Sequence, residues 1–156
     1  MKKAFFYQTE IGKIGVAEEN GAVTNVFFGN TVVPKEYELK ETPLLLLASK
    51  ELKEYLSGKR RAFSLPLNPQ GTPFEQEVWR ALLTIPYGET RTYGEIAKAV
   101  GRPKACRAVG RANGLNPISI FIPCHRVVGK NGTLTGYAGG LKLKEQLLQL
   151  EQAKLA

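Results

Sequence analysis

Two capping boxes constrain the fold of this chain more than any other feature of its sequence. Thr72-Pro73-Phe74-Glu75 and Thr92-Tyr93-Gly94-Glu95 each place a threonine three residues before a glutamate. In that pattern the two side chains satisfy backbone N–H groups at the start of a helix, and Pro73 suits the first helical position. The first helix carries its apolar face on Phe74, Val78, Ala81, Leu82 and Ile85. The second is short and ends at Gly101, so the sequence predicts two closely spaced helices.

A third helix is predicted to begin at Pro103 and to close at Gly114. Two short helices joined by a tight turn with glycine form a helix-turn-helix pattern. Lys104, Arg107 and Arg111 follow each other at helical spacing and make one basic stripe. The small residues Cys106, Ala108 and Gly110 flank this stripe, while Ala105, Val109 and Ala112 form the packing face. We interpret this helix as the DNA-facing one. The alternative is a charged surface helix of a protein–protein module.

The first 70 residues have a different pattern, typical of β-strands. Residues 3–9, 13–19 and 22–28 are rich in β-branched and aromatic side chains, and Asn20-Gly21 is a strong signal for a two-residue hairpin turn. A helix capped by Thr42 and closed at Gly58 is predicted to follow, then a strand over residues 63–67 and a linker at 68–71. We therefore expect an α/β (α+β) protein with two domains: a small antiparallel sheet plus helix in residues 1–70, and a helical domain with a winged helix-turn-helix in residues 71–156.

The segment Pro123-Cys124-His125-Arg126-Val127 is the candidate for chemistry. His125 is the only histidine in the chain, and it directly follows one of only two cysteines. A cysteine reacts as its thiolate, which a nearby base or cation favours. We expect residues 118–122 to form a short strand that delivers Cys124, and Asn131-Gly132 to turn a hairpin that forms the wing. A last helix over about residues 141–154 places Glu145 near its start.

The charge and the cysteine content of the chain limit which binding partners, cell compartment and metal sites are compatible with it. Between Glu95 and Glu145 the chain has nine basic residues and no acidic one, and the net charge is +8. This distribution favours nucleic acid as the partner, although a solvated basic surface is the alternative. Two cysteines cannot form a disulfide framework, which indicates a reducing compartment. Two cysteines, one histidine and no aspartate are too few for a four-ligand zinc site. We expect a soluble, cytoplasmic protein with no metal, no other cofactor, no signal peptide and no membrane segment.

From residue 72 onward, the motifs resemble one family. Residues 72–151 are similar to the O6-alkylguanine-DNA alkyltransferases, also called methylated-DNA–protein-cysteine methyltransferases, whose signature is Pro-Cys-His-Arg-Val. The matching stretches are Thr72-Pro73-Phe74, Tyr87-Gly88-Glu89, Thr92-Tyr93-Gly94-Glu95, Pro103-Lys104-Ala105, Arg107-Ala108-Val109-Gly110, Asn113, Asn116-Pro117, Pro123 to Val128, and Tyr137-Ala138-Gly139-Gly140-Leu141. Residues 1–70 fit the family's variable, ribonuclease-H-like N-terminal domain in length and element order.

The resemblance implies an activity and a role for each matched residue. Cys124 would accept an alkyl group from O6-alkylguanine, and also from O4-alkylthymine, in duplex DNA after the nucleotide is flipped out of the helix. The transfer would be irreversible, so each molecule would act once. His125 would take the thiol proton through a water, and Glu145 would orient the imidazole. Tyr93 would donate a hydrogen bond to the departing purine, and Asn116 would hold the turn before the active-site strand.

Two further sets of residues follow from the resemblance and the basic helix. Arg107 would fill the space left by the flipped nucleotide. The expected DNA contacts are Thr92, Tyr93, Lys104, Ala105, Cys106, Arg107, Ala108, Gly110, Arg111 and Arg126. The expected guanine pocket consists of Tyr93, Cys124, Val127, Tyr137, Ala138 and Gly139. We expect a monomer whose partner is double-stranded DNA that carries alkylated guanine.

Two other functions remain compatible with the residues alone. A winged-helix regulator or lesion sensor would bind DNA without transfer chemistry, with Cys124 in a structural or redox-sensing role. A cysteine hydrolase acting on small molecules is more distant. A regulator would show base-specific binding, usually as a dimer on two half-sites, whereas a repair protein would bind mainly through phosphates.

Overall fold

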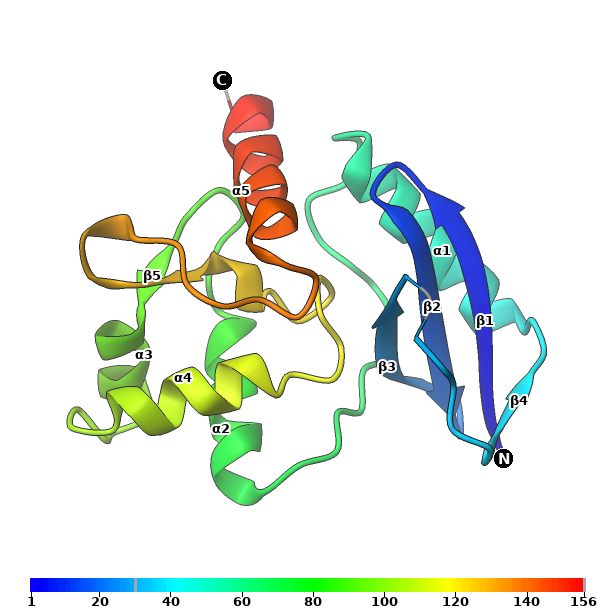
Figure 1. The fold of residues 1–156 in the computed structure, drawn as a ribbon, viewed down its shortest axis with the longest axis horizontal. Helices are drawn as coiled ribbons and strands as arrows, with labels where there is room; N and C mark the ends of the chain where they lie inside the picture. The colour runs from blue at the N-terminus through cyan, green and yellow to red at the C-terminus, as the bar shows by residue number, and fades with distance from the viewer. Residues whose placement is uncertain (30, 156) are drawn as a thin grey trace. The chain divides into compact units, whose positions relative to one another are not determined.

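The computed structural model describes residues 1–29 and 31–155. The chain forms two compact units, one from Met1 to Pro69 and the other from Gln70 onward (Figure 1). Each unit is described separately below. The first is built on a sheet and the second on helices, so the chain has the mixed α/β character that its sequence predicts.

The first unit contains a four-stranded sheet in the order β3-β2-β1-β4. Strands β1 (Lys2–Thr9), β2 (Gly12–Glu19) and β3 (Ala22–Phe28) form the predicted antiparallel meander. Asn20 and Gly21 both have positive φ, 54° and 80°, as a tight hairpin turn requires. The short strand β4 (Tyr37–Leu39) pairs in parallel with β1 and was not predicted.

Helix α1 (Pro43–Leu56) lies across one face of this sheet (Figure 1). The Thr42 side chain accepts a hydrogen bond from the Leu45 N–H and caps the helix, as predicted. The strand predicted for residues 63–67 is reduced to a single bridge between Val23 and Leu67. Pro66 lies within this segment and has no N–H to donate to a ladder, which limits the pairing.

The second unit begins with α2 (Pro73–Leu82), which is followed by α3 (Tyr93–Ala99) and α4 (Cys106–Gly114). Both predicted capping boxes form with both of their hydrogen bonds. The predicted start of the third helix at Pro103 is wrong. Pro103 and Lys104 instead occupy a turn that is closed by the Ala105 N–H donating to the Arg102 carbonyl at 2.9 Å. Proline suits the second position of such a turn.

The segment before Cys124 is a buried turn and not the predicted strand. The Ile122 N–H donates to the Ile118 carbonyl at 2.9 Å, and Ile120 has φ of 75°. The Asn116 side chain explains this conformation, because it accepts from the Ile118 N–H at 3.0 Å and donates to the Ile122 carbonyl at 2.9 Å. A side chain that binds both ends of a segment holds it as a turn.

The remaining elements lead from the cysteine to the last helix. The 3-10 helix η1 (Cys124–Arg126) is followed by β6 (Val127–Val128), 3-10 helix η2 (Lys130–Gly132) and α5 (Leu141–Leu155). The predicted turn at Asn131-Gly132 forms with positive φ at both residues, but the limb that returns from it is not a strand. Strand β6 instead pairs in parallel with β5 (Arg91–Thr92). The returning limb contains Gly136, Gly139 and Gly140, and glycine disfavours a strand.

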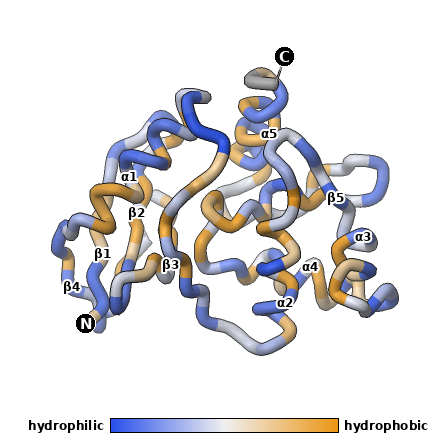
Figure 2. The backbone as a smooth tube through the Cα atoms, turned by 180° about the vertical axis from the view of Figure 1, so that it is seen from behind, coloured by the Kyte–Doolittle hydropathy of each residue, from blue (hydrophilic) through white to orange (hydrophobic). Residues whose placement is uncertain are grey.

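Apolar side chains fill the interior of the second unit. Trp79 is buried against α4, where its indole N–H donates to the Ala112 carbonyl at 2.9 Å. The helices carry hydrophobic and hydrophilic residues in alternation along the chain, as expected of helices with one buried face (Figure 2). Within the described residues, none of the helices has the length and apolar character that crossing a membrane requires.

Candidate active site

A buried ion-pair network joins η1 to α5. His125 Nε2 lies 2.8 Å from Glu151 Oε2, and the exposed fractions of the two side chains are 0% and 1%. The Gly88 N–H also donates to Glu151, at 3.1 Å. Glu151 therefore collects donors from two separate parts of the chain, and it holds the imidazole in one orientation.

Arg126 belongs to this network and not to a DNA-binding surface. Its Nε donates to Glu151 at 2.9 Å, its Nη2 donates to the same carboxylate at 3.0 Å, and its Nη1 donates to the Ile85 carbonyl at 2.8 Å. The side chain is 9% exposed. The expected DNA contact of Arg126 is therefore wrong, because the tight turn of η1 directs the guanidinium into the protein, where it neutralises Glu151.

The structure also corrects the acid expected beside His125. Glu145 is exposed, and its carboxylate accepts a hydrogen bond from Gln149 on the same helix at 3.1 Å. Glu145 and Glu151 are six residues apart, so they point about 120° apart around a helix of 3.6 residues per turn. Because α5 packs Leu143 and Leu147 inward, Glu151 faces η1 and Glu145 faces solvent.

The bond to Glu151 determines which imidazole nitrogen can act as a base. A carboxylate only accepts hydrogen bonds, so neutral His125 carries its proton on Nε2 and its lone pair on Nδ1. Burial lowers the pKa of His125, and the neighbouring Glu151 opposes that shift. The ring is consequently neutral at neutral pH and able to accept a proton.

The thiol of Cys124 is buried, with 4% of the residue exposed. Burial raises the pKa of the Cys124 thiol, while hydrogen bonds from the side chains of Asn116 and Ser119 and the positive charge of Lys144 act in the opposite direction. Lys144 is itself buried, and its Nζ donates to the Thr135 carbonyl at 3.0 Å. The thiol therefore stays protonated in the resting protein, but its surroundings can stabilise a thiolate once a base removes the proton.

Other predicted pocket residues come from the start of α3, from β6 and from the loop that precedes α5. Val127 is fully buried directly after η1. The ring of Tyr137 stands edge-on to His125, with ring centres 6.5 Å apart. The Tyr93 hydroxyl is hydrogen-bonded to the Thr135 hydroxyl of this loop. Gly139 is partly buried, whereas Ala138 is exposed.

Helix α4 exposes most of the residues predicted to face DNA. Arg107, Arg111, Cys106 and Ala108 are exposed, whereas Val109 and Ala112 are buried. Lys104 is exposed in the preceding turn, and Ala105, Gly110 and Thr92 are partly buried. Thr92 caps α3, since its side chain accepts from the Glu95 N–H at 3.1 Å. At Gly110 a β-carbon would lie 3.7 Å from the Tyr93 ring, so α4 and Tyr93 are close neighbours.

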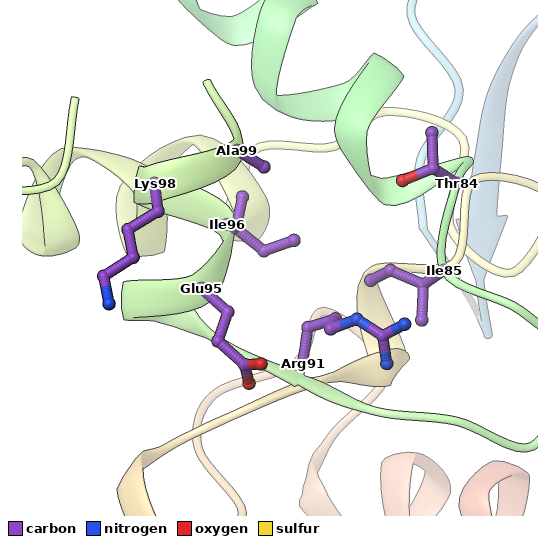
Figure 3. A pocket seen from close by; sticks show the side chains of 7 residues that line it. All are labelled: Thr84, Ile85, Arg91, Glu95, Ile96, Lys98 and Ala99. Atoms are coloured by element: carbon purple, nitrogen blue, oxygen red, sulfur yellow. The ribbon is translucent and has the colours of Figure 1, made fainter. Parts of the chain in front are cut away.

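A pocket of about 370 Å³ lies elsewhere in the second unit, and Figure 3 shows its lining. It is formed by Thr84, Ile85, Arg91, Glu95, Ile96, Lys98 and Ala99. Arg91 pairs with Glu89 at 3.0 Å, and Glu95 accepts from the Thr92 N–H at 2.9 Å. Arg91 and Glu95 therefore make contacts within their own segment, and the lining of the pocket contains neither Cys124 nor His125. The candidate active site is therefore the segment of Cys124 with its network, and not this pocket.

Comparison with known proteins gives the family. Residues 73–153 match the DNA binding domain of 6-O-methylguanine DNA methyltransferase, and residues 3–69 match its ribonuclease-like domain. The chain belongs to the 6-O-methylguanine DNA methyltransferase family. The resemblance predicted from the sequence is thus confirmed, and it extends over both units.

Several members of this methyltransferase family are similar to the chain over most of its length. The constitutive methylated-DNA–protein-cysteine methyltransferase of Bacillus subtilis is 50% identical over 154 residues, which cover 93% of this chain and 92% of that protein. The Mycobacterium tuberculosis protein is 47% identical over 146 residues, 92% of this chain and 88% of that one. A crystal structure of Mycobacterium tuberculosis OGT in complex with DNA superposes with a TM-score of 0.91 at 43% identity, covering 97% of this chain and 94% of that one.

Sequence reasoning missed three residues of the candidate site: Glu151, Lys144 and Ser119. A signal for Glu151 existed, because it follows Leu147 by one helical turn and so places a charge on the apolar face of α5. A charged group on a buried face needs a partner. Lys144 gave the same signal, because it precedes Glu151 by seven residues and so lies on the same face of α5. Ser119 gave no comparable signal, since its burial depends on how distant segments pack.

Proposed function

We propose that this chain repairs duplex DNA by moving the alkyl group of O6-alkylguanine, and of O4-alkylthymine, onto the sulfur of Cys124. The observation that carries this proposal is the buried pair of His125 and Glu151, with His125 directly following the buried thiol of Cys124 on the same 3-10 turn. In this proposal Cys124 is the nucleophile, His125 is the base and Glu151 orients the base, which is the arrangement of a catalytic triad with a thiol in place of a hydroxyl. Family membership supports the same reaction.

The proposed transfer is a single displacement. His125 Nδ1 takes the thiol proton through a water, and Lys144 favours the resulting thiolate. The sulfur attacks the alkyl carbon, a carbon–sulfur bond forms, and the bond from that carbon to the guanine oxygen breaks with its electron pair left on the purine. Tyr93 donates a hydrogen bond to the purine as negative charge develops. The proton then passes to guanine, so a thiol and an alkylguanine give a thioether and guanine.

Access to the reacting carbon requires that the nucleotide leave the base stack, which costs a few kcal/mol. In the proposal, α4 binds the backbone of the duplex and Arg107, which is exposed on this helix, takes the place of the flipped nucleotide. One chain supplies every proposed residue, so we propose that it acts as a monomer. Because the reaction needs a free thiol, and both cysteines are free, we propose that it acts in the reducing cytoplasm.

The test is the mass of the intact protein after mixing with duplex DNA that contains one O6-methylguanine, followed by peptide mapping. We expect a gain of one methyl group on Cys124, at one equivalent per molecule, with guanine restored in the DNA. Cys106 is the internal control, and its peptide should keep its mass. The Cys124→Ser variant should bind the DNA and gain no mass. An unchanged mass of the unmodified protein with intact DNA binding would favour the regulator or lesion sensor.

A further inference from the structure

Thr135 links two residues of the proposed site. It lies in the loop between η2 and α5, and its hydroxyl is hydrogen-bonded to the hydroxyl of Tyr93. Its backbone carbonyl accepts a hydrogen bond from Lys144 Nζ at 3.0 Å. Both Thr135 and Tyr93 are partly buried, so this pair of hydroxyls is held at the edge of the protein interior.

The backbone and the side chain of Thr135 have separate tasks. Lys144 is buried, and its hydrogen bond to Thr135 is made to the backbone carbonyl and not to the side chain. Lys144 therefore anchors the loop whichever side chain residue 135 carries. Tyr93 is positioned from its own side, because it opens α3 and its ring lies against Gly110 of α4. The threonine hydroxyl is therefore not needed to bring the loop and Tyr93 together. What it can set is the direction of the tyrosine O–H bond.

Each hydroxyl can donate one hydrogen bond and accept others. If Tyr93 donates to Thr135, its only proton is used within the protein. If Thr135 donates to the Tyr93 oxygen, the tyrosine proton is available for a substrate, and a hydroxyl that accepts one hydrogen bond becomes a stronger donor. Only the second arrangement suits a tyrosine that must donate to a purine on which negative charge develops.

We propose that Thr135 is a positioning residue whose hydroxyl donates to Tyr93 and so directs the Tyr93 proton toward the departing purine. This inference rests on the proposed function, in which Tyr93 makes that contact. Thr135 does not touch the reacting atoms. It acts through Tyr93, and its contribution exists only while the Tyr93 hydroxyl is present.

The test measures the single-turnover rate constant of methyl transfer at saturating DNA. Thr135→Val removes the hydroxyl and keeps the shape, Thr135→Ala is a second variant without it, and Thr135→Ser retains it. Thr133→Val is the matched control in the same loop, because the Thr133 hydroxyl donates to the Lys130 carbonyl at 3.1 Å and is exposed. We expect Thr135→Val and Thr135→Ala to slow transfer about fivefold, which is less than the loss on removing a group that contacts the developing charge directly. Thr135→Ser and Thr133→Val should stay within about twofold of the unmodified protein.

A double-mutant cycle separates positioning from a structural role. In a Tyr93→Phe background, Thr135→Val should cause no further slowing, because the oxygen that it acts on is gone. Equal slowing in both backgrounds, or an unchanged rate for Thr135→Val and Thr135→Ala, would overturn the inference alone. Absence of transfer by the unmodified protein would overturn the proposed function and this inference with it.

Discussion

His125 and Glu151 form a buried hydrogen bond of 2.8 Å between residues that are 26 positions apart in the chain. The same carboxylate also pairs with Arg126 at 2.9 Å. One acid thus orients the proposed base and neutralises a buried guanidinium. Because Glu151 has both roles, its substitution should have much larger effects than substitution of Glu145 on the same helix.

Glu151→Gln should lower both the rate of methyl transfer and the stability of the protein. The amide cannot neutralise Arg126, and breaking a buried ion pair from one side costs about 3–5 kcal/mol of unfolding free energy. Glu145→Gln is the matched control, because Glu145 is exposed on α5 and contacts only Gln149 in the described hydrogen bonds. It should leave both quantities unchanged. Urea unfolding and single-turnover rates measure the two effects, and a slow Glu145→Gln variant would restore the original assignment of the acid.

The free energy of unfolding should fall as the pH is lowered below about 6.5, because of His125. Burial lowers the pKa of His125 in the folded protein, while the unfolded chain has the usual pKa of about 6.5. Between these two values the unfolded state binds a proton that the folded state does not, so the stabilisation is complete above about pH 6.5 and is lost as pH falls through the folded pKa. Urea unfolding between pH 5 and 8 should show this decline.

The pH experiment has a simple control, since His125 is the only histidine in the chain. In His125→Gln, unfolding free energy should vary less over the same range of pH. The rate of methyl transfer in the unmodified protein should fall with the protonation of the same ring, because an imidazolium cannot accept the thiol proton. A rate that rises as pH falls would exclude His125 as the base.

The two arginines at positions 111 and 126 should differ in what they stabilise. Arg111 is exposed on α4, so Arg111→Ala should weaken duplex binding and reduce the slope of log affinity against log salt by about 0.9 for one phosphate contact. Arg126→Gln should leave that slope unchanged and lower the unfolding free energy, because Glu151 loses its buried partner. Binding measured from low to high salt, together with urea unfolding, distinguishes the two. A reduced slope for Arg126→Gln would reinstate it on the DNA surface.

Arg107→Ala should slow repair in duplex DNA more than in single strands. Filling the vacated space matters only where a base stack must close behind the flipped nucleotide. Arg111→Ala, one helical turn further along α4, is the control, and it should not change the ratio of the two transfer rates at saturating DNA. The measurement is the single-turnover rate on the same O6-methylguanine strand with and without its complement. Equal slowing of Arg107→Ala on both substrates would exclude a role in extrusion.

Local sequence signals predicted most elements well. The Asn20-Gly21 hairpin and the two capping boxes all formed, because each depends on a few neighbouring residues whose hydrogen bonds close within one turn. The strand expected before Cys124 did not form, and the cause is again a set of local hydrogen bonds. The Asn116 side chain competes for the backbone groups of that segment and bends it into a turn, which apolar composition does not reveal.

The sequence by itself determined the family and singled out the proposed reactive pair Cys124-His125, since covalent adjacency and short motifs carry that information. Only the tertiary structure decided which acid meets the imidazole and where the guanidinium of Arg126 points. Helical periodicity places Glu151, and not Glu145, on the apolar face of α5, but only the packing of that helix against η1 shows which groups Glu151 meets. A buried charge is stable only beside its partner, and Glu151 finds two partners that are distant in the chain.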